Sequence, residues 1–448
     1  MTHNGPRGIP LVGPVAELVQ DPLAFLEQIA DEYGDIIRFR EGPTRWVTLF
    51  QHPDHIEEIL LRQHRSLKKG RVTRMMRRAL DDGLITSEGE HWRRQRKLAS
   101  PAFTRGQISL YGDVMVELTA RAIDQWEHDE IRNVHHDMMS LTLDVISSVL
   151  FSTSATPQIQ HRVSTALETI FTEFDKDVHS WRLLLPQWAP TSGRRRVAQA
   201  KAELHSILDD CIAAGQARDT TGTDLLGQLL TVKAEDGTSM SNEELREELL
   251  TLFVAGHETT ALALFFALHL LGKHPEVADK ACMVIDEAIG NRLPCVDDLP
   301  DLQYIQAIID ESMRLYPPIW LIEREVTTPF EVGGVRLQRG NQILCSQWVT
   351  HKDERWWPNA QAFRPDRWMQ AQAHPRFAYF PFGGGPRVCI GNHFAMMEAV
   401  LLLTTLLQRV RYLPAEAGSP ALTPSVTIRP TSHTHMRVRL TDATLFND

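Results

Sequence analysis

Cysteine is scarce in this 448-residue chain, and its occurrences are far apart. They are Cys211, Cys282, Cys295, Cys345 and Cys389. No two of them form a Cys-x-x-Cys pair, so the sequence offers neither a zinc ribbon nor a disulfide framework, and it fits a reducing compartment. Positive charge is also in deficit, because 47 Lys and Arg residues against 57 Asp and Glu residues give a net charge of -10. General nucleic-acid binders are more often basic, so we expect no nucleic-acid partner.

The sequence also shows no pattern typical of a membrane-targeting segment. The first residues lack the basic and then apolar pattern of a secretory signal. The longest apolar stretch, from about Leu249 to Leu271, is long enough to cross a bilayer. It carries His257 and Glu258 at its centre, however, and polar groups there would be costly in lipid. We therefore predict a buried helix of a soluble protein and expect no membrane anchor.

The composition that is present is that of an ordinary globular protein, 43% hydrophobic and 23% charged. No repeat or low-complexity linker divides the chain, so we predict a single domain over 1–448 with an irregular lead-in over 1–14. Helical patterns dominate up to about Tyr316. Short strand-like pieces interrupt them at Ile36–Arg40 and Trp46–Phe50.

A long central helix is the clearest single element in the sequence. Ser241 followed by Glu244 forms a capping box that starts it, and the pattern runs to Lys273, where Pro275 follows as a stop signal. Short strands with turns come later, and a further helix is expected from about Asn392 to Arg409. The fold class predicted is therefore mainly α with small β-sheets.

The strongest chemical signal is the segment Phe-Gly-Gly-Gly-Pro-Arg-Val-Cys-Ile-Gly, from Phe382 to Gly391. Its glycines allow a backbone to approach a flat ligand closely, and Cys389 precedes a helix whose positive dipole end favours thiolate. One soft sulfur ligand without a His or Cys partner suits haem iron better than zinc. A phosphate loop is the first alternative, but no Lys-Ser or Lys-Thr follows. A small buried hydrophobic cysteine is the second.

This segment resembles the haem-binding signature of the cytochrome P450 superfamily at every defined position. The resemblance implies the fold of that family, with haem b between the long central helix and the loop and helix that carry the cysteine. It implies Cys389 as the ligand of the haem iron and Arg387 on a haem propionate. It also implies cofactor contacts from Phe382, Gly391 and, on the long helix, Ala255.

Two further segments resemble family motifs that support the cysteine loop. Glu311 and Arg314 match the Glu-x-x-Arg pattern, and residues three apart share one face of a helix. Arg367 lies in a segment like the one whose arginine joins that pair. The resemblance implies a buried network of these three side chains, whereas the pair alone is more often a weak surface salt bridge.

The long helix carries an acid beside an alcohol, Glu258 and Thr259, after Gly256. This resembles the family motif that delivers protons for oxygen activation. A His-Glu-x-x-His metal helix is excluded because Ala261 occupies the second histidine position. A buried polar patch is the plain alternative. With O2 as co-substrate, the resemblance implies an enzyme that hydroxylates or epoxidises its substrate; a haem-binding sensor without turnover is the alternative from another class.

The remaining expectations concern the cofactor's acidic edge and the electron donor. Trp92, Arg96 and Arg324 match family positions that reach the haem propionates, although a solvated surface is the default for each arginine alone. Arg93, Arg94 and Lys97 add positive charge to the same short helix. Either they are solvated, or they steer an acidic ferredoxin (or a flavodoxin) that passes on electrons from NAD(P)H through its reductase.

Substrate contacts follow only from family positions: Ile319, Ala263 and Val426. The stretches from about Arg71 to Leu84 and from Phe171 to Trp188 are expected to roof the pocket. These positions are mostly apolar, so we expect a hydrophobic substrate such as a fatty acid, a terpenoid or a polyketide. The absence of an anchor beside a proline-rich start favours a bacterial, cytoplasmic member of the family, with a monomer as the default state.

Overall fold

The computed structural model describes residues 4–9, 13–42, 45–151, 156–178, 191–217, 224–234, 237–370 and 374–441. Its helices are α1 (Val15–Gln20), α2 (Pro22–Tyr33), α3 (Pro53–Glu57), α4 (Arg71–Leu80), α5 (Gly89–Ala99), α6 (Arg105–Ile108), α7 (Gly112–Ile123), α8 (Val134–Phe151), α9 (Pro157–Val178), α10 (Ser192–Gln216), α11 (Leu225–Thr231), α12 (Asn242–Lys273), α13 (Pro275–Ala288), α14 (Gln303–Leu315), α15 (Gln347–Thr350) and α16 (Asn392–Arg409).

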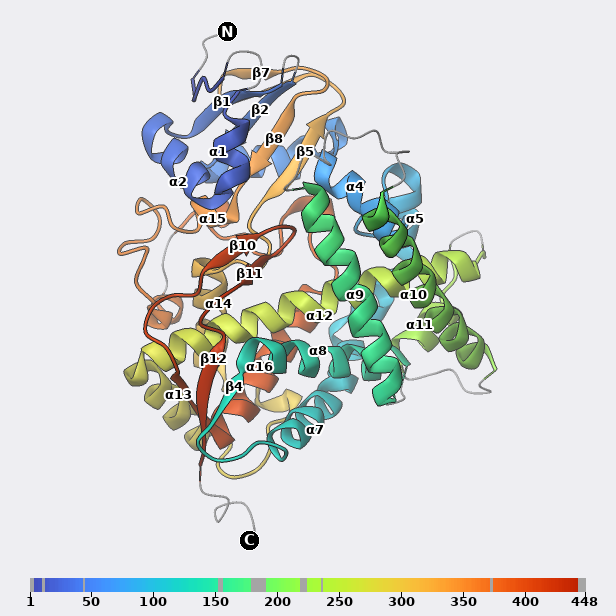
Figure 1. Cartoon of the computed structure of the whole chain (residues 1–448), viewed down its shortest axis with the longest axis vertical. Helices are drawn as coiled ribbons and strands as arrows, with labels where there is room; N and C mark the ends of the chain where they lie inside the picture. Colours follow the sequence, from blue (N-terminus) through green and yellow to red (C-terminus); the bar gives the residue numbers. More distant parts are fainter. Residues whose placement is uncertain are drawn as a thin grey trace.

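Helix α12 crosses the middle of the molecule, as Figure 1 shows, and other helices pack around it. The predicted capping box is present: the Ser241 hydroxyl accepts from the Glu244 N–H at 3.2 Å, and the Glu244 carboxylate accepts from the Ser241 N–H at 2.8 Å. The helix ends at Lys273, and Pro275 begins α13. Its most apolar stretch is long enough to span a membrane, but 83% of that stretch is buried in the protein. It is therefore the core helix that the sequence predicts.

The strands are short and form small sheets, of which the largest lies at the end of the molecule near the N-terminus (Figure 1). They are β1 (Ile36–Glu41), β2 (Arg45–Phe50), β3 (Leu67–Lys69), β4 (Glu130–Asn133), β5 (Ile322–Val326), β6 (Phe330–Val332), β7 (Val335–Leu337), β8 (Gln342–Cys345), β9 (Val410–Pro414), β10 (Leu422–Pro424), β11 (Ile428–Pro430) and β12 (His435–Leu440).

The largest sheet has the strand order β1-β2-β8-β5-β3, in which only β2 and β8 are parallel. Three more sheets are β4-β12-β9, β10-β11 and β6-β7. The register places Arg324 of β5 opposite Ile343 of β8 and opposite Lys69 of β3. This sheet therefore brings cationic side chains from distant parts of the chain to one place.

The predicted fold class, mainly α with small β-sheets, is confirmed, and so are the bounds of α16 and both early strands to within one residue. The described part of the lead-in, residues 4–9 and 13–14, contains no helix or strand. The single-domain organisation stays a prediction. The predicted roof segment Phe171–Trp188 is described only to residue 178, and its remainder lies outside the described residues.

Candidate active site

A cavity of about 610 Å³ lies between α12 and the loop that precedes α16. Its walls come from α4, α5, α9, β5 and the turn between β10 and β11. All but three of the predicted site residues line it: Cys389, Glu258, Thr259, Trp92, Arg96, Arg324, Phe382, Arg387, Gly391, Ala255, Ile319, Val426 and Ala263. The exceptions, Glu311, Arg314 and Arg367, lie in the core beside it. The fold thus gathers residues that lie more than 300 positions apart in the sequence, such as Trp92 and Val426.

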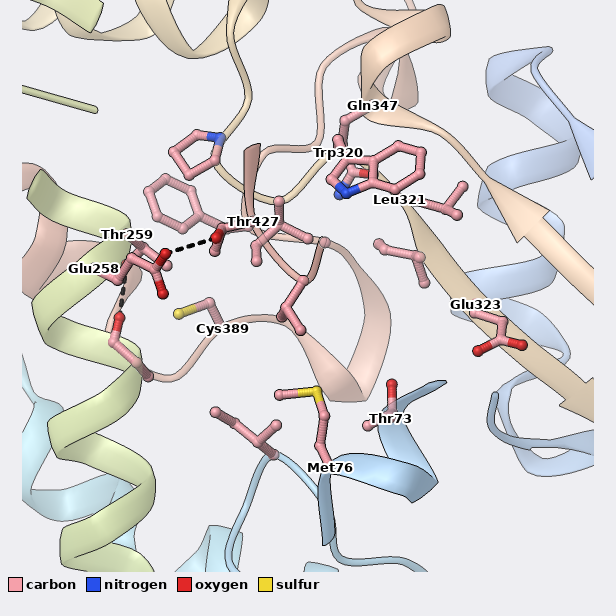
Figure 2. A pocket seen from close by; sticks show the side chains of 18 of the residues that line it. Thr73, Met76, Glu258, Thr259, Trp320, Leu321, Glu323, Gln347, Cys389 and Thr427 are labelled. Atoms are coloured by element: carbon pink, nitrogen blue, oxygen red, sulfur yellow. Dashed lines mark hydrogen bonds between the residues drawn. The ribbon is translucent and has the colours of Figure 1, made fainter. Parts of the chain in front are cut away.

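The Cys389 side chain is exposed to this cavity and points toward α12, where Glu258 and Thr259 lie (Figure 2). Its N–H donates to the Phe382 carbonyl at 3.0 Å, which closes the loop on itself. Burial raises the pKa of the thiol, and the Gly391 N–H and the charge of Arg96 offset only part of that effect. Binding to a metal would hold the sulfur as thiolate in spite of its surroundings.

Three arginines border the cavity near Cys389. Arg96 donates to the Val388 carbonyl at 3.0 Å, and Arg324 donates to the Glu323 carbonyl at 2.9 Å. Arg387 donates to the Glu88 carboxylate at 2.6 Å, and its guanidinium lies 3.7 Å from the centre of the Trp92 ring. Burial lowers the pKa of Arg387 to about 10, and repulsion by the other arginines adds to the effect although Glu88 opposes it. The site therefore has an excess of buried positive charge that favours an anionic group.

These features fit a haem. The cavity offers a sulfur ligand to one side and apolar walls for a flat macrocycle. Ala255 and Gly256 of α12 are small residues, so they leave room above the sulfur. The arginines supply donors where the two carboxylates of the group would need them. Among the described residues, no cluster of three His, Cys, Asp or Glu side chains could hold a separate metal ion.

The side chains of the acid and the alcohol of α12 are hydrogen-bonded to different partners. The Thr259 hydroxyl donates to the Ala255 carbonyl at 2.7 Å, one turn earlier on the helix. The Glu258 carboxylate accepts from the Thr427 hydroxyl at 2.8 Å and is paired with Arg429. Figure 2 shows the Glu258–Thr427 bond beside the cavity. Burial acts to raise the pKa of Glu258, but attraction by Arg429 and the hydrogen bonds outweigh it, so the pKa lies below its ordinary value.

The side chains of Glu311, Arg314 and Arg367 meet in the core, as predicted. Arg314 donates to both Glu311 oxygens at 2.8 and 2.9 Å, and Arg367 donates at 3.0 Å. The Trp368 indole and the Arg364 N–H complete the set around Glu311, each at 2.9 Å. Every lone pair of this buried carboxylate therefore has a donor, which is the condition under which a buried ion network is tolerated.

A further contact ties this network to the cysteine loop. Arg314 donates to the His351 carbonyl at 2.9 Å, and the His351 ring accepts from the Phe380 N–H, also at 2.9 Å. Phe380 lies two residues before Phe382, where the loop begins. The network therefore fixes the path of the chain that leads to Cys389.

The sequence did not predict three partners of the site: Arg429, Thr427 and Glu88. Arg429 and Thr427 lie in the hairpin of β10 and β11, and no local pattern marks them as partners of α12. Glu88 was visible only as an acid near the predicted Trp92 helix. In the predicted basic patch on that helix, Arg93 is paired with Glu90 and Arg94 with Glu244.

The comparisons with known proteins agree with this geometry. Residues 4–435 match the family model described as "Cytochrome P450". Cyclooctatin synthase of Streptomyces melanosporofaciens is 35% identical over 91% of this chain and 89% of its own length. Cyclooctat-9-en-7-ol 5-monooxygenase of the same organism is 34% identical over 92% and 90%. Pentalenene oxygenase of Streptomyces avermitilis is 31% identical over 91% and 90%.

The family match spans nearly the whole chain and includes every residue of the cavity named above. The structure brings a cysteine loop, an arginine-lined edge and an acid–alcohol pair around one cavity, and the family match covers all three. The chain belongs to the cytochrome P450 family and is a cytochrome P450 monooxygenase.

Proposed function

We propose that the protein binds haem b through Cys389 and oxidises a terpenoid, with O2 as co-substrate. The observation that carries the proposal is the Cys389 sulfur, which faces an apolar cavity opposite Glu258 and Thr259. Thiolate-ligated haem supplies, when bound, the activation of O2 and the insertion of one oxygen atom into a C–H or C=C bond. Binding, orientation and proton supply would depend on the residues of the chain.

The cofactor would be held by contacts at its centre and at its edge. Cys389 would bind the iron, and Arg96, Arg324 and Arg387 would hold the propionates, with Trp92 stacked on Arg387. The propionates would then compete with Glu88 for Arg387. Phe382, Gly391 and Ala255 line the same space and would pack on the faces of the macrocycle.

Protons would enter through the acid and the alcohol of α12. The hydrogen of the Thr259 hydroxyl is directed at the Ala255 carbonyl, so its oxygen is left to accept a hydrogen bond from the cavity. Glu258 is charged at neutral pH because Arg429 holds its pKa low. Glu258 would accept a proton on the side of its carboxylate that faces Arg429 and would release it toward the cavity. Thr259 would orient the group that receives this proton.

A neutral terpenoid fits the apolar cavity better than a charged fatty acid does. Met75, Met76, Phe171 and Phe174 add to its apolar lining, together with Ile319, Ala263 and Val426. Arg71, a lining cation that is not assigned to the propionates, lies 3.8 Å from the Glu41 carboxylate, so a fatty acid finds little there to bind its charge. Two of the relatives are named for oxidation of cyclooctat-9-en-7-ol and of pentalenene, which supports a substrate of this kind.

The electron donor would be a ferredoxin with its reductase, which draws on NAD(P)H. Helix α5 places Arg93, Arg94 and Lys97 on an otherwise acidic protein. The similarity to Streptomyces relatives supports a bacterial, cytoplasmic setting. Reduction by ferredoxin should slow for a Lys97→Glu variant at low salt, and the difference should shrink as salt is added. An Arg439→Glu variant on β12, away from α5 in Figure 1, is the control.

The absorption spectrum of the reduced, carbon-monoxide-bound protein tests the central claim. We expect a strongly red-shifted Soret band in the wild type and in Cys282→Ala, and its loss in Cys389→Ala. A band typical of histidine-ligated haem, or no haem, contradicts the claim. For the substrate, pentalenene should shift the spectrum of the oxidised protein and dodecanoic acid should not. The reverse result would contradict the preference for a terpenoid over a fatty acid.

A further inference from the structure

The loop between α4 and α5 forms a wall of the cavity that the proposed reaction does not explain. The side chains of Leu84 and Ile85 line the cavity from this loop. Neither residue belongs to a helix or strand, so nothing in the regular structure fixes their backbone. The turn is closed by hydrogen bonds from the Thr86 and Ser87 N–H groups to the Gly83 carbonyl, and the peptide groups of Leu84 and Ile85 are held by a pair of buried ionisable residues from two other elements.

Glu248 of α12 and Lys69 of β3 both bind the backbone of this wall, Glu248 as a hydrogen-bond acceptor and Lys69 as a donor. A carboxyl oxygen of Glu248 accepts from the Leu84 N–H at 3.4 Å. The Lys69 ammonium donates to the Leu84 carbonyl at 2.9 Å and also to the Ile85 carbonyl. Glu248 is fully buried and Lys69 is 8% exposed. Such long charged side chains are seldom buried unless their polar ends have a task.

The loop lies directly on α12 beside this clamp. A Cβ at Gly83 would fall 2.2 Å from the Thr251 hydroxyl and 2.6 Å from the Glu247 carbonyl, so glycine permits the close approach. At its start the loop is tied to α10, because Asp81 accepts from His205 at 2.7 Å and is paired with Lys201. The wall therefore rests against rigid elements, and Glu248 and Lys69 set its position between these ties.

We infer that Glu248 and Lys69 are positioning residues that fix the Leu84–Ile85 wall and thereby determine which part of a bound molecule faces Cys389. The inference rests on the proposed function, since it assumes a haem at Cys389. To that function the inference adds the residues that set the orientation of the bound molecule. Neither touches the reacting atoms.

The protonation of Glu248 decides which substitution preserves the clamp. Its second oxygen has no hydrogen-bond partner, and burial raises its pKa to about 8. The side chain is then a neutral acid at pH 7 whose acceptor oxygen meets Leu84. Glutamine offers the same acceptor in the same shape, whereas leucine offers the shape without the acceptor.

The test compares how Glu248→Gln and Glu248→Leu bind two azoles of different reach. Imidazole needs only the iron, whereas 4-phenylimidazole also extends to the cavity wall. We expect Glu248→Leu to change the affinity ratio of the two probes by about fivefold or more, the size expected from one lost hydrogen bond. Glu248→Gln should keep the ratio within about twofold of the wild type. Glu243→Leu, exposed on the same helix, is the matched control, and haem content checks folding.

Each remaining result has a definite meaning. An unchanged ratio in Glu248→Leu, or the same change in Glu248→Gln, overturns the inference. If Glu248→Leu fails to bind haem, Lys69→Met decides in its place, because loss of the donors to Leu84 and Ile85 must also change the ratio. Failure of the wild type to bind imidazole at a haem contradicts the proposed function itself.

Discussion

Glu258 is paired with Arg429 across the cavity wall, while its neighbour Thr259 is bonded to its own helix. Arg429 also lies 3.8 Å from Asp175 of α9, and its guanidinium lies 4.8 Å from the centre of the Phe171 ring. The acid of the proton path is therefore held by a strand hairpin and a roof helix together. Its charge depends on a residue that lies 171 positions away.

Replacement of Arg429 by methionine should shift the pH dependence of turnover. Burial then acts on Glu258 without the attraction of Arg429, so the pKa of Glu258 rises. A carboxylate with a raised pKa stays protonated to higher pH, and the acidic limb of the kcat profile should move to higher pH. The rate of product formation from pH 5 to pH 9 measures this. Arg439→Met, at an exposed position of β12, should leave the limb in place. An unshifted limb in Arg429→Met would mean that Glu258 carries no proton in the reaction.

The cysteine loop depends on the network at Glu311. Glu311→Gln removes the charge that two buried arginines share, and Arg314 and Arg367 then remain buried with too little negative charge. The expected loss is about 3–5 kcal/mol of the free energy of unfolding, with release of haem at lower urea. Urea titrations followed by Soret absorbance and circular dichroism measure both.

A surface pair provides the comparison for that network. Arg162 and Glu203 are 48% and 41% exposed, so Glu203→Gln should cost less than about 1 kcal/mol. Equal losses for Glu203→Gln and Glu311→Gln would mean that burial of the network has no particular importance.

Local patterns predicted much of this molecule because they act locally. The ends of α12 follow from Ser241, Glu244 and Pro275, which are neighbours of the helix in sequence. The cysteine segment is continuous, so its glycines and Cys389 could be recognised together. These features need no knowledge of how distant segments meet.

The partners of the site could not be predicted for the opposite reason. Arg429 reaches Glu258 only because the β10–β11 hairpin folds over α12, and many other arginines carry the same local signal. Glu88 pairs with Arg387 because α5 begins beside the cysteine loop. The clamp of Glu248 and Lys69 likewise joins residues whose own neighbourhoods resemble ordinary helix and strand. Pairing of this kind is a property of the packed fold.

Glu398 of α16 should make the protein's stability fall as pH rises. It is fully buried, one oxygen accepts from the Thr260 hydroxyl at 3.1 Å, and the other has no partner. Burial raises its pKa to about 8, against an ordinary value of 4.5. Between these values the unfolded chain loses the proton and the folded chain keeps it. The free energy of unfolding therefore falls by up to about 1.4 kcal/mol per pH unit from this group.

Glu398→Gln removes that dependence and keeps an acceptor for Thr260. The stability of the variant relative to the wild type should increase steadily from pH 5 to pH 8, as urea midpoints at each pH would measure. Glu243→Gln, exposed on α12, should show no such trend. A constant difference between Glu398→Gln and the wild type would mean that Glu398 is ionised in the folded protein.

The cysteine loop also depends on one glycine, Gly385. Its φ of +67° lies in the left-handed region, and a Cβ there would fall 2.1 Å from the Leu60 carbonyl, a backbone atom that cannot swing away. Gly385→Ala must therefore push the loop from the segment Glu58–Arg62, at a strain of about 1–3 kcal/mol before any clash is counted. Because Cys389 follows four residues later, we expect less haem per protein chain, measured by the pyridine haemochrome assay, and a weaker red-shifted carbon-monoxide band. Gly106→Ala, where a Cβ meets open space, should retain the full haem content. If Gly385→Ala also retains it, the position of the loop is not what presents the sulfur to the cavity.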